Sequence, residues 1–201
     1  MAGTTAEVTL GRRERNKQAK LERIVAAASE LFAEHGVDDV TTQQIADRAD
    51  IGSGTLFLYA KTKGELLLLV QNAHYAEALE RGTLAASTVT NTLDAVMAVV
   101  RPVIECNRVQ VDNGRTYLRE MAFGDPTEPH HAQALTIVAQ TEEALASIIE
   151  RDKRTTPEAA STLARVMSAV MFLTMAASVN TLLSIDEIEA EIRRQVALIL
   201  P

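Results

Sequence analysis

The stretch that decides the fold is residues 41–59, which read TTQQIADRADIGSGTLFLY. Thr41 and Gln44 have the spacing of a capping box, so a helix is expected to start just after Thr41. Residues 50–53 break this helix after little more than two turns, and Ser53 is expected to cap a third short helix that runs through Tyr59. Two short helices separated by a turn that contains Gly52 predict a compact helical unit.

Longer helices are predicted on both sides of this stretch. From residue 17 to residue 35 apolar side chains recur at helical spacing, at Leu21, Ile24, Val25, Ala28, Leu31 and Phe32. Thr62 and Glu65 repeat the capping-box spacing and open a helix over 63–79. With Ile51, Leu56 and Phe57 packed inward, the third helix would present its other face to the major groove, as in a helix-turn-helix.

The remainder of the chain is also predicted to be helical. Aliphatic residues and Ala dominate, and aromatic residues make up only 3% of the sequence. We expect a helix over 90–111 that stops at Asp112-Asn113-Gly114, and then a shorter helix that ends at residue 123. Further helices are expected over 129–151, 157–184 and 186–200. The sequence therefore predicts an all-α, nine-helix protein of two domains. The expected domains are a disordered basic arm over 1–16, a three-helix helix-turn-helix head over 17–64, and a helical body over 65–201 that is expected to bind a ligand and form the dimer.

Charge is distributed unevenly along the chain. The net charge is −7, but residues 1–64 hold nine basic and nine acidic residues, so the negative charge resides in the body. Residues 12–23 contain six Lys or Arg against two Glu. A basic segment on an acidic body can bind a polyanion locally, and the alternative is that it is a solvated tail. Arg12, Arg13 and Arg15 would accordingly either reach a DNA minor groove or stay free.

Three features indicate a cytoplasmic protein. Cys106 is the single cysteine and cannot form an internal disulfide, which suits a reducing compartment. Residues 1–18 lack the apolar core of a secretory signal. The most apolar stretch, 163–183, contains Arg165, Asn180 and several hydroxyl side chains, so we interpret it as a buried or interfacial helix and expect no membrane partner.

Residues 18–78 resemble the TetR family of bacterial transcriptional regulators. The resemblance rests on four motifs in register: Ile24-x3-Ala28-x2-Leu31-Phe32-x3-Gly36, Thr41-Thr42-x2-Ile45-Ala46, Ile51-x2-Gly54-Thr55-Leu56-Phe57 and Lys63-x-Glu65-Leu66-Leu67. The sequence departs from the usual family pattern at three positions, which are Phe57 in place of Tyr, Ala60 in place of Phe, and Gly64 in place of an acidic residue. Beyond residue 80 the similarity fades, although the expected number of helices agrees.

The resemblance implies where double-stranded DNA would be contacted. Thr42 and Gln43 lie where the family starts its second helix, and Lys63 matches the usual phosphate-binding lysine. Lys61, at the entrance of the next helix, is a further candidate for phosphate contact, although both lysines have an alternative as solvated turn residues. Gln43 could likewise be only a solvated residue at a helix start, and Tyr59 could be a half-buried packing residue. The recognition helix is expected to contribute Ser53, Gly54, Thr55, Leu58 and Tyr59.

A repressor of this kind reads a palindromic operator as a homodimer. Its two recognition helices must lie about 34–36 Å apart, one turn of B-DNA. The helices over 157–184 and 186–200 are the expected four-helix interface, with an apolar stripe at Ile188, Ile192, Val196 and Ile199. An intramolecular core is the alternative interpretation of the same stripe.

An unidentified small-molecule effector is expected to bind in the body. The candidate lining residues of this pocket, each of which has plain core packing as its alternative, are Met97, Val100, Arg101, Ile104, Tyr117, Met121, Phe123, Phe172 and Met175. Arg101 and Arg119 would favour an anionic effector only if they are buried beside this surface. No cofactor, metal site or catalytic residue is expected, because the sequence shows no phosphate-binding glycine loop, no metal-spaced cluster and no nucleophile–base motif. The alternative function is a helical small-molecule-binding protein or enzyme that does not bind DNA.

Overall fold

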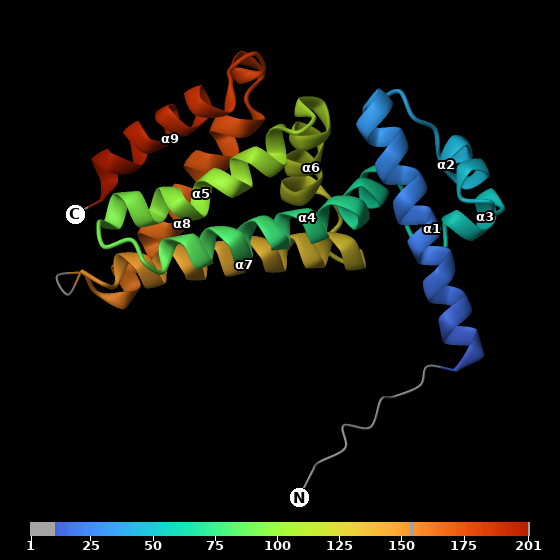
Figure 1. Cartoon of the computed structure of the whole chain (residues 1–201), viewed down its shortest axis with the longest axis horizontal. Helices are drawn as coiled ribbons and strands as arrows, with labels where there is room; N and C mark the ends of the chain where they lie inside the picture. The colour runs from blue at the N-terminus through green and yellow to red at the C-terminus, as the bar shows by residue number, and fades with distance from the viewer. Residues whose placement is uncertain (1–10, 153–154, 201) are drawn as a thin grey trace, which may run out of the picture.

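The computed structural model describes residues 11–152 and 155–200, and within them the chain is helical and has no strand. The helices divide into a small head and an elongated body, joined by a long helix that starts in the head (Figure 1). This arrangement confirms the predicted all-α, nine-helix, two-domain fold. The elements are α1 (Arg12–His35), α2 (Thr42–Arg48), α3 (Ser53–Leu56), α4 (Lys63–Ala86), α5 (Thr92–Arg108), α6 (Val111–Phe123), α7 (Pro129–Ile149), α8 (Pro157–Ala176), the 3₁₀ helix η1 (Ser178–Asn180) and α9 (Ile185–Ile199).

Capping interactions fix the short helices of the head. The Thr41 side chain accepts a hydrogen bond from the Gln44 backbone N–H, and the Gln44 side chain accepts one from the Thr41 N–H, which completes the predicted capping box. Thr62 accepts a 3.0 Å bond from the Glu65 N–H at the start of α4. Ile24, Phe32, Ile45 and Leu56 are buried together in the core that these helices share.

The first helix is longer than expected. Residues 12–16 were predicted to belong to a disordered arm, but α1 starts at Arg12, directly after Gly11. Arg and Glu at 12–15, followed by Lys, Gln and Ala at 17–19, are good helix formers. Glu14 lies in the first turn, where a negative charge is favourable. The remaining arm residues, 1–10, lie outside the described residues.

The predicted helix stop at Asp112-Asn113-Gly114 is wrong. These residues form the first turn of α6, because Gln110 caps the helix by accepting a 2.6 Å bond from the Asn113 N–H. Gly114 is needed for packing rather than for a turn, since a Cβ there would lie 2.0 Å from the carbonyl oxygen of Asn107. Near the other end of the chain, the expected helix over 157–184 ends at Ala176, and η1 leads into α9.

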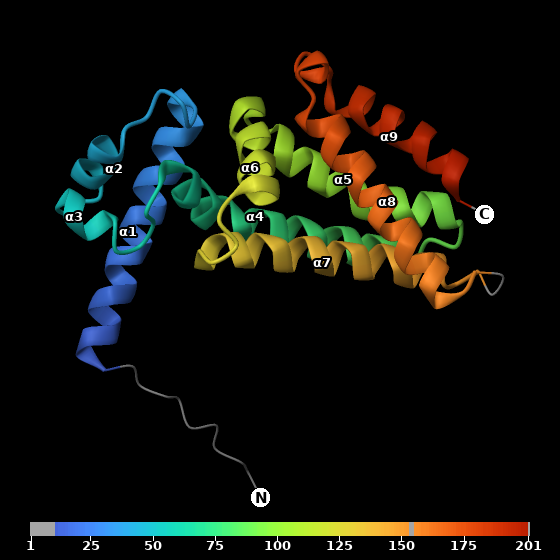
Figure 2. The same cartoon turned by 180° about the vertical axis from the view of Figure 1, so that it is seen from behind.

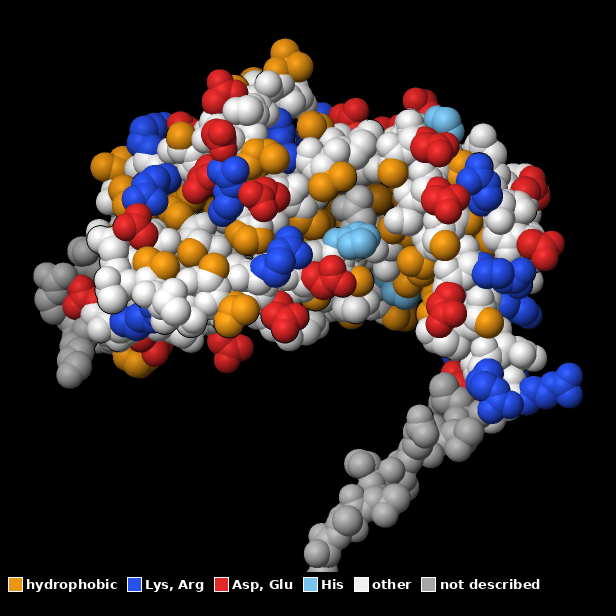
Figure 3. All heavy atoms as spheres, viewed as in Figure 1, with side chains coloured by type: hydrophobic (Ala, Val, Ile, Leu, Met, Phe, Trp, Pro, Cys, Tyr) orange, Lys and Arg blue, Asp and Glu red, His pale blue; other side chains and the backbone are white. Residues whose placement is uncertain are grey.

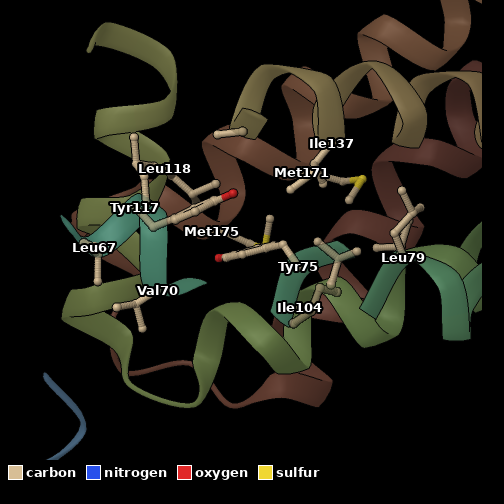
Figure 4. Close-up of a cluster of buried hydrophobic side chains, with 14 of the residues drawn as sticks. Leu67, Val70, Tyr75, Leu79, Ile104, Tyr117, Leu118, Ile137, Met171 and Met175 are labelled. Atoms are coloured by element: carbon tan, nitrogen blue, oxygen red, sulfur yellow. The ribbon is translucent and has the colours of Figure 1, made fainter. Parts of the chain in front are cut away.

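The body is built around α4, which packs on α5, α6 and α7, while α8 and α9 cover α7 and α5 (Figures 1 and 2). Tyr75 of α4 and Tyr117 of α6 stack in its interior with their ring centroids 4.1 Å apart. In Figure 4, Met175 lies beside Tyr75 and Ile104 closes the same cluster from α5. Of the described helices, α8 alone is long and apolar enough to cross a membrane, a test that core helices also pass.

The crossing of α4 and α5 gives a test of this packing. A Cβ on Gly82 would lie 2.7 Å from the carbonyl oxygen of Val99, so Gly82→Ala forces two helix backbones apart. We expect this substitution to lower the free energy of unfolding by about 1–3 kcal/mol in denaturant titrations. Gly54→Ala, where a Cβ meets open space, serves as the control and should be neutral or slightly stabilising. Equal stability of the two variants would contradict the close crossing.

Candidate nucleic-acid interface and its coupling to the body

The segment from Ser53 to Tyr59 lies on the outside of the head. Leu58 is 83% exposed and Gly54 is exposed, while Ser53, Thr55 and Tyr59 are partly covered. Ser53 was expected to cap this helix, but the N-cap residue is Gly52. The Ser53 hydroxyl instead donates a 2.5 Å bond to the Gln43 side chain. The regular helix ends at Leu56 and continues as hydrogen-bonded turns to Ala60.

One side chain of this segment points the other way from the prediction. Phe57 was expected to pack inward but is 47% exposed. Leu56 and Ala60, four residues apart, both face the core, and this spacing turns Phe57 away from it by about 100°. Phe57 therefore joins Leu58 on the outer surface, where an apolar pair is suited to contact thymine methyl groups in a major groove.

Basic side chains border this segment. Residues 53–59, which we call the recognition segment, enclose an open groove together with the first turns of α1. The lining of this groove includes Arg12, Arg13, Lys17, Lys20, Thr55, Leu58 and Tyr59. The Tyr59 hydroxyl donates a 3.2 Å hydrogen bond to the Lys17 carbonyl, which holds the two walls together. Figure 3 shows Lys and Arg side chains gathered at this end of α1. The sequence did not predict this groove, because it exists only if residues 12–16 are helical.

The other predicted DNA-contacting residues are engaged within the head or with the body. Thr42 starts α2, and Gln43 bridges Ser53 and Asp47. The Lys63 ammonium donates a 2.9 Å bond to the Asp38 carbonyl. Lys61 forms an ion pair with Glu128 of the body, and the hydrogen bond and charge of Glu128 raise the pKa of Lys61.

Asn113 is a buried contact between head and body that sequence reasoning missed. Its side-chain oxygen accepts a 2.7 Å bond from the Val37 N–H, and its amide donates a 2.8 Å bond to the Phe32 carbonyl. Both partners lie at the end of α1, where the Phe32 carbonyl also accepts a 3.0 Å bond from the Gly36 N–H. Asn113 of α6 thus fixes the turn between α1 and α2 to the body.

The structure separates the predicted effector residues into three groups. The first consists of fully packed core residues, namely Met97, Val100, Ile104, Tyr117 and Met175, with Met121 half-buried against them. Phe123 and Phe172 line a different surface hollow of about 360 Å³ beside Arg115 and Arg119. Arg101 forms the third group. It pairs with Glu105, Asp186 and Glu189 and joins α5 to α9.

A cleft lies between the head and the body. It has a volume of about 350 Å³ and is lined by α1, α4 and the α5–α6 junction, with Phe32, Val70, Cys106 and Val109 as apolar residues and Gln71, Glu77 and Arg81 as polar ones. Figure 3 shows the surface hollowed between α1 and the body. Burial raises the pKa of the Cys106 thiol to about 11, so the thiolate is scarce at neutral pH. No group of His, Cys, Asp or Glu within the described part of the chain has the arrangement of a metal site.

The apolar stripe of α9 is used differently from the prediction. Ile188, Ile192 and Val196 were expected at a dimer interface, but they are fully buried against the chain's own helices. The outward faces of α8 and α9 instead form a shallow groove that includes Val166, Val170, Leu173, Ala177, Leu183 and Ala190. Leu173 is 67% exposed in this groove.

Substitution of Asn113 tests the buried contact between the two domains. Asn113→Ala leaves the Val37 N–H and the Phe32 carbonyl without their side-chain partner, so we expect a loss of about 2–3 kcal/mol in urea unfolding. The neighbouring Asp112→Ala removes only an exposed ion pair with Arg115 and should change stability by less than about 0.5 kcal/mol. Losses of the same size in both variants would show that the Asn113 bonds contribute nothing specific.

Comparisons with known proteins agree with this architecture. Residues 24–70 match the family model of the bacterial regulatory proteins of the tetR family. A curated relative, the fatty acid metabolism regulator protein of Bacillus subtilis (strain 168), is 31% identical over 67 residues, 33% of this chain; the match spans about a third of that relative's length.

Solved structures extend the similarity of fold to the body. A TetR transcriptional regulator from Rhodococcus sp. RHA1 has a TM-score of 0.71 at 20% identity, over 92% of this chain and 97% of that one. FadR of Thermus thermophilus, a TetR-family transcriptional repressor solved with lauroyl-CoA, has a TM-score of 0.70 at 20% identity, over 90% and 93%. Residues 24–70 therefore match the tetR family model, and the described chain as a whole shares its fold with these solved TetR regulators.

Proposed function

We propose that this chain is a transcriptional repressor that binds a palindromic operator as a homodimer and leaves it when a small-molecule effector binds the body. The observation that carries the proposal is the exposed segment Ser53–Tyr59 beside the basic groove of α1. A major groove admits one helix, and phosphates on both sides of it attract basic side chains. The acidic body would repel the duplex elsewhere and leave the head as the contact surface.

DNA contacts are proposed for the predicted residues with different roles. Thr55, Leu58 and Tyr59 line the basic groove, and Gly54 and Phe57 are exposed on the same segment. Thr42 and Gln43 at the start of α2, with Lys63, lie where they can meet the phosphate backbone. Lys61 must leave Glu128 to contact a phosphate. The helical extension of α1 supplies Arg12, Arg13, Lys17 and Lys20 as additional phosphate contacts.

A substitution at the tip of the recognition segment tests DNA binding. Leu58→Glu places a carboxylate on the surface that would face phosphates and bases, so we expect about 100-fold weaker binding. The probe is a duplex that the wild-type protein selects from a random pool, titrated by fluorescence anisotropy. Leu84→Glu adds the same charge at a similarly exposed position on the body and should bind normally. If the two variants bind equally well, the recognition segment is not the contact surface.

The dimer is proposed to form through the outward faces of α8 and α9. Their groove combines small and apolar side chains, and Leu173, Val179, Leu182 and Leu198 leave large apolar surfaces exposed there or at the adjoining turn. A second copy related by a two-fold axis would cover these surfaces and form a four-helix interface. The buried stripe of α9 supports this interface from behind by fixing α9 to α5.

Light scattering tests this interface. Leu173→Glu places a charge in the centre of the proposed contact, where it would have to be buried without a partner, so the variant should be monomeric at micromolar concentration. Leu84→Glu, which carries the same substitution outside the interface, should remain a dimer. A dimeric Leu173→Glu protein would place the interface elsewhere.

The effector is proposed to act by changing how the body holds the head. An effector in the predicted interior site must separate the Tyr75–Tyr117 stack, since core side chains fill that space. The interdomain cleft offers a hollow that already exists and is bordered by Phe32 and Asn113 at the junction of head and body. The ligand-bound relative FadR, which shares the fold, supports effector binding by a body of this shape.

A further inference from the structure

His130, in the first turn of α7, contacts the end of the recognition segment. Its ring nitrogen Nε2 lies 3.0 Å from the Tyr59 carbonyl oxygen. A carbonyl accepts and does not donate, so this nitrogen carries the proton and donates to it. Carbonyl groups at the end of a helical segment lack an N–H partner from the next turn, and a His side chain is one of the groups that satisfies them.

The backbone of His130 is held by α4. Its N–H donates a 2.8 Å bond to the carboxylate of Glu65, which is only 5% exposed, and its carbonyl accepts a 2.9 Å bond from the Asn72 amide. A carboxylate at the start of α7 also meets the positive end of that helix dipole. Asn72 in turn accepts a 2.9 Å bond from the Tyr117 hydroxyl in the body core.

These contacts form a continuous connection from Tyr117 through Asn72 and His130 to Tyr59, which we call the α7 tether. Glu65 holds the His130 N–H as part of the tether, and the Lys61–Glu128 ion pair also joins the head to the body. One end is Tyr117, stacked on Tyr75 where an effector was predicted to bind. The other end is the recognition segment. From the tether, α7 runs back along α4 and packs on α8, the helix proposed for the dimer interface (Figure 2).

The neighbouring His131 shows that this arrangement leaves a polar group unsatisfied. It is 3% exposed, and neither of its ring nitrogens has a hydrogen-bond partner among the described residues. A buried polar side chain without a partner costs free energy. A shift of the first turn of α7 that gave the His131 ring a partner would remove this cost, and it would also move His130.

We propose that the α7 tether sets the position of the recognition segment, that His130 is its positioning residue, and that the unpartnered His131 makes the tether releasable. This inference rests on the proposed repressor function and states how its body reports to its DNA-contacting surface. In the form shown, His130 holds Tyr59 and the head is competent to bind. When the first turn of α7 shifts, the Tyr59 carbonyl loses its donor and the recognition segment loses its fixed position.

Substitutions at the two histidines should have opposite effects on DNA binding. His130→Ala should weaken binding to the selected duplex about tenfold, while the slope of affinity against salt stays that of the wild type because no phosphate contact is lost. His130→Gln retains a side-chain N–H donor and should recover most of the affinity. His131→Leu removes the unsatisfied group, so it should raise the melting temperature and tighten binding about threefold. His74→Ala, an exposed histidine of α4, is the matched control.

Hydrogen exchange gives a readout that does not depend on DNA. In the full-length protein, His130→Ala should speed amide exchange in residues 56–61 while the core of α4 keeps its protection. If the wild-type protein selects no duplex at all, the proposed repressor function fails, and this exchange result alone then judges the tether. Unchanged exchange in residues 56–61 would overturn it. The tether would also be overturned if His130→Ala reduced the slope of affinity against salt to that of Lys63→Ala. A His131→Leu protein that is less stable than the wild type would overturn it as well.

Discussion

The recognition segment cannot hold its own shape, and the rest of the structure follows from that constraint. Four residues of regular helix, Ser53–Leu56, are far too few to be stable alone in water, because nucleation of a helix is unfavourable and only later turns repay it. Neighbouring groups therefore impose its geometry. Leu56 anchors the segment in the core, and the Gln43 side chain accepts a hydrogen bond from the Ser53 hydroxyl. The Lys17 carbonyl accepts a hydrogen bond from the Tyr59 hydroxyl, and the His130 ring donates one to the Tyr59 carbonyl.

Each of these supports comes from a different part of the chain, so the segment responds to distant changes. Gln43 belongs to α2 and Lys17 to α1, and both move with the head. His130 belongs to the body, and Asn113 fixes the turn between α1 and α2 to the body by a second route. A body that shifts relative to the head must strain or break one of these contacts. In the proposed repressor, this would convert a small rearrangement in the core into a change at the surface proposed to contact DNA.

Local patterns predicted the head well because its signals are local. The capping box of Thr41 and Gln44, the Thr62 cap and the apolar spacing of α1 each depend on residues within one turn of one another. Apart from the start of α1, the Ser53 cap and the orientation of Phe57, the errors arose where distant residues decide the structure. Asn113 and Gly114 read as a helix stop, yet contacts with Phe32, Val37 and Asn107 place them inside α6. The α9 stripe likewise fits an interface or a core equally well until α5 is seen to cover it.

The same distinction explains the candidate sites. Residues of the recognition segment follow from helix spacing, whereas the basic groove, the interdomain cleft and the α7 tether join residues that are far apart in sequence. His130 and Tyr59 are 71 residues apart, and no spacing rule connects them. The Met and aromatic residues predicted to line a pocket mostly pack in the core instead. Helical spacing alone could not distinguish the two, because apolar residues at that spacing fill a core as readily as they line a cavity.

The most direct test of the account is a map of backbone amide protection on the full-length protein, with and without a duplex that it selects. We predict that the duplex slows exchange in residues 12–20 and 41–61 and leaves exchange on the outward face of α8 and α9 unchanged. Protection confined to the body, with residues 53–59 exchanging as fast as in the free protein, would contradict it.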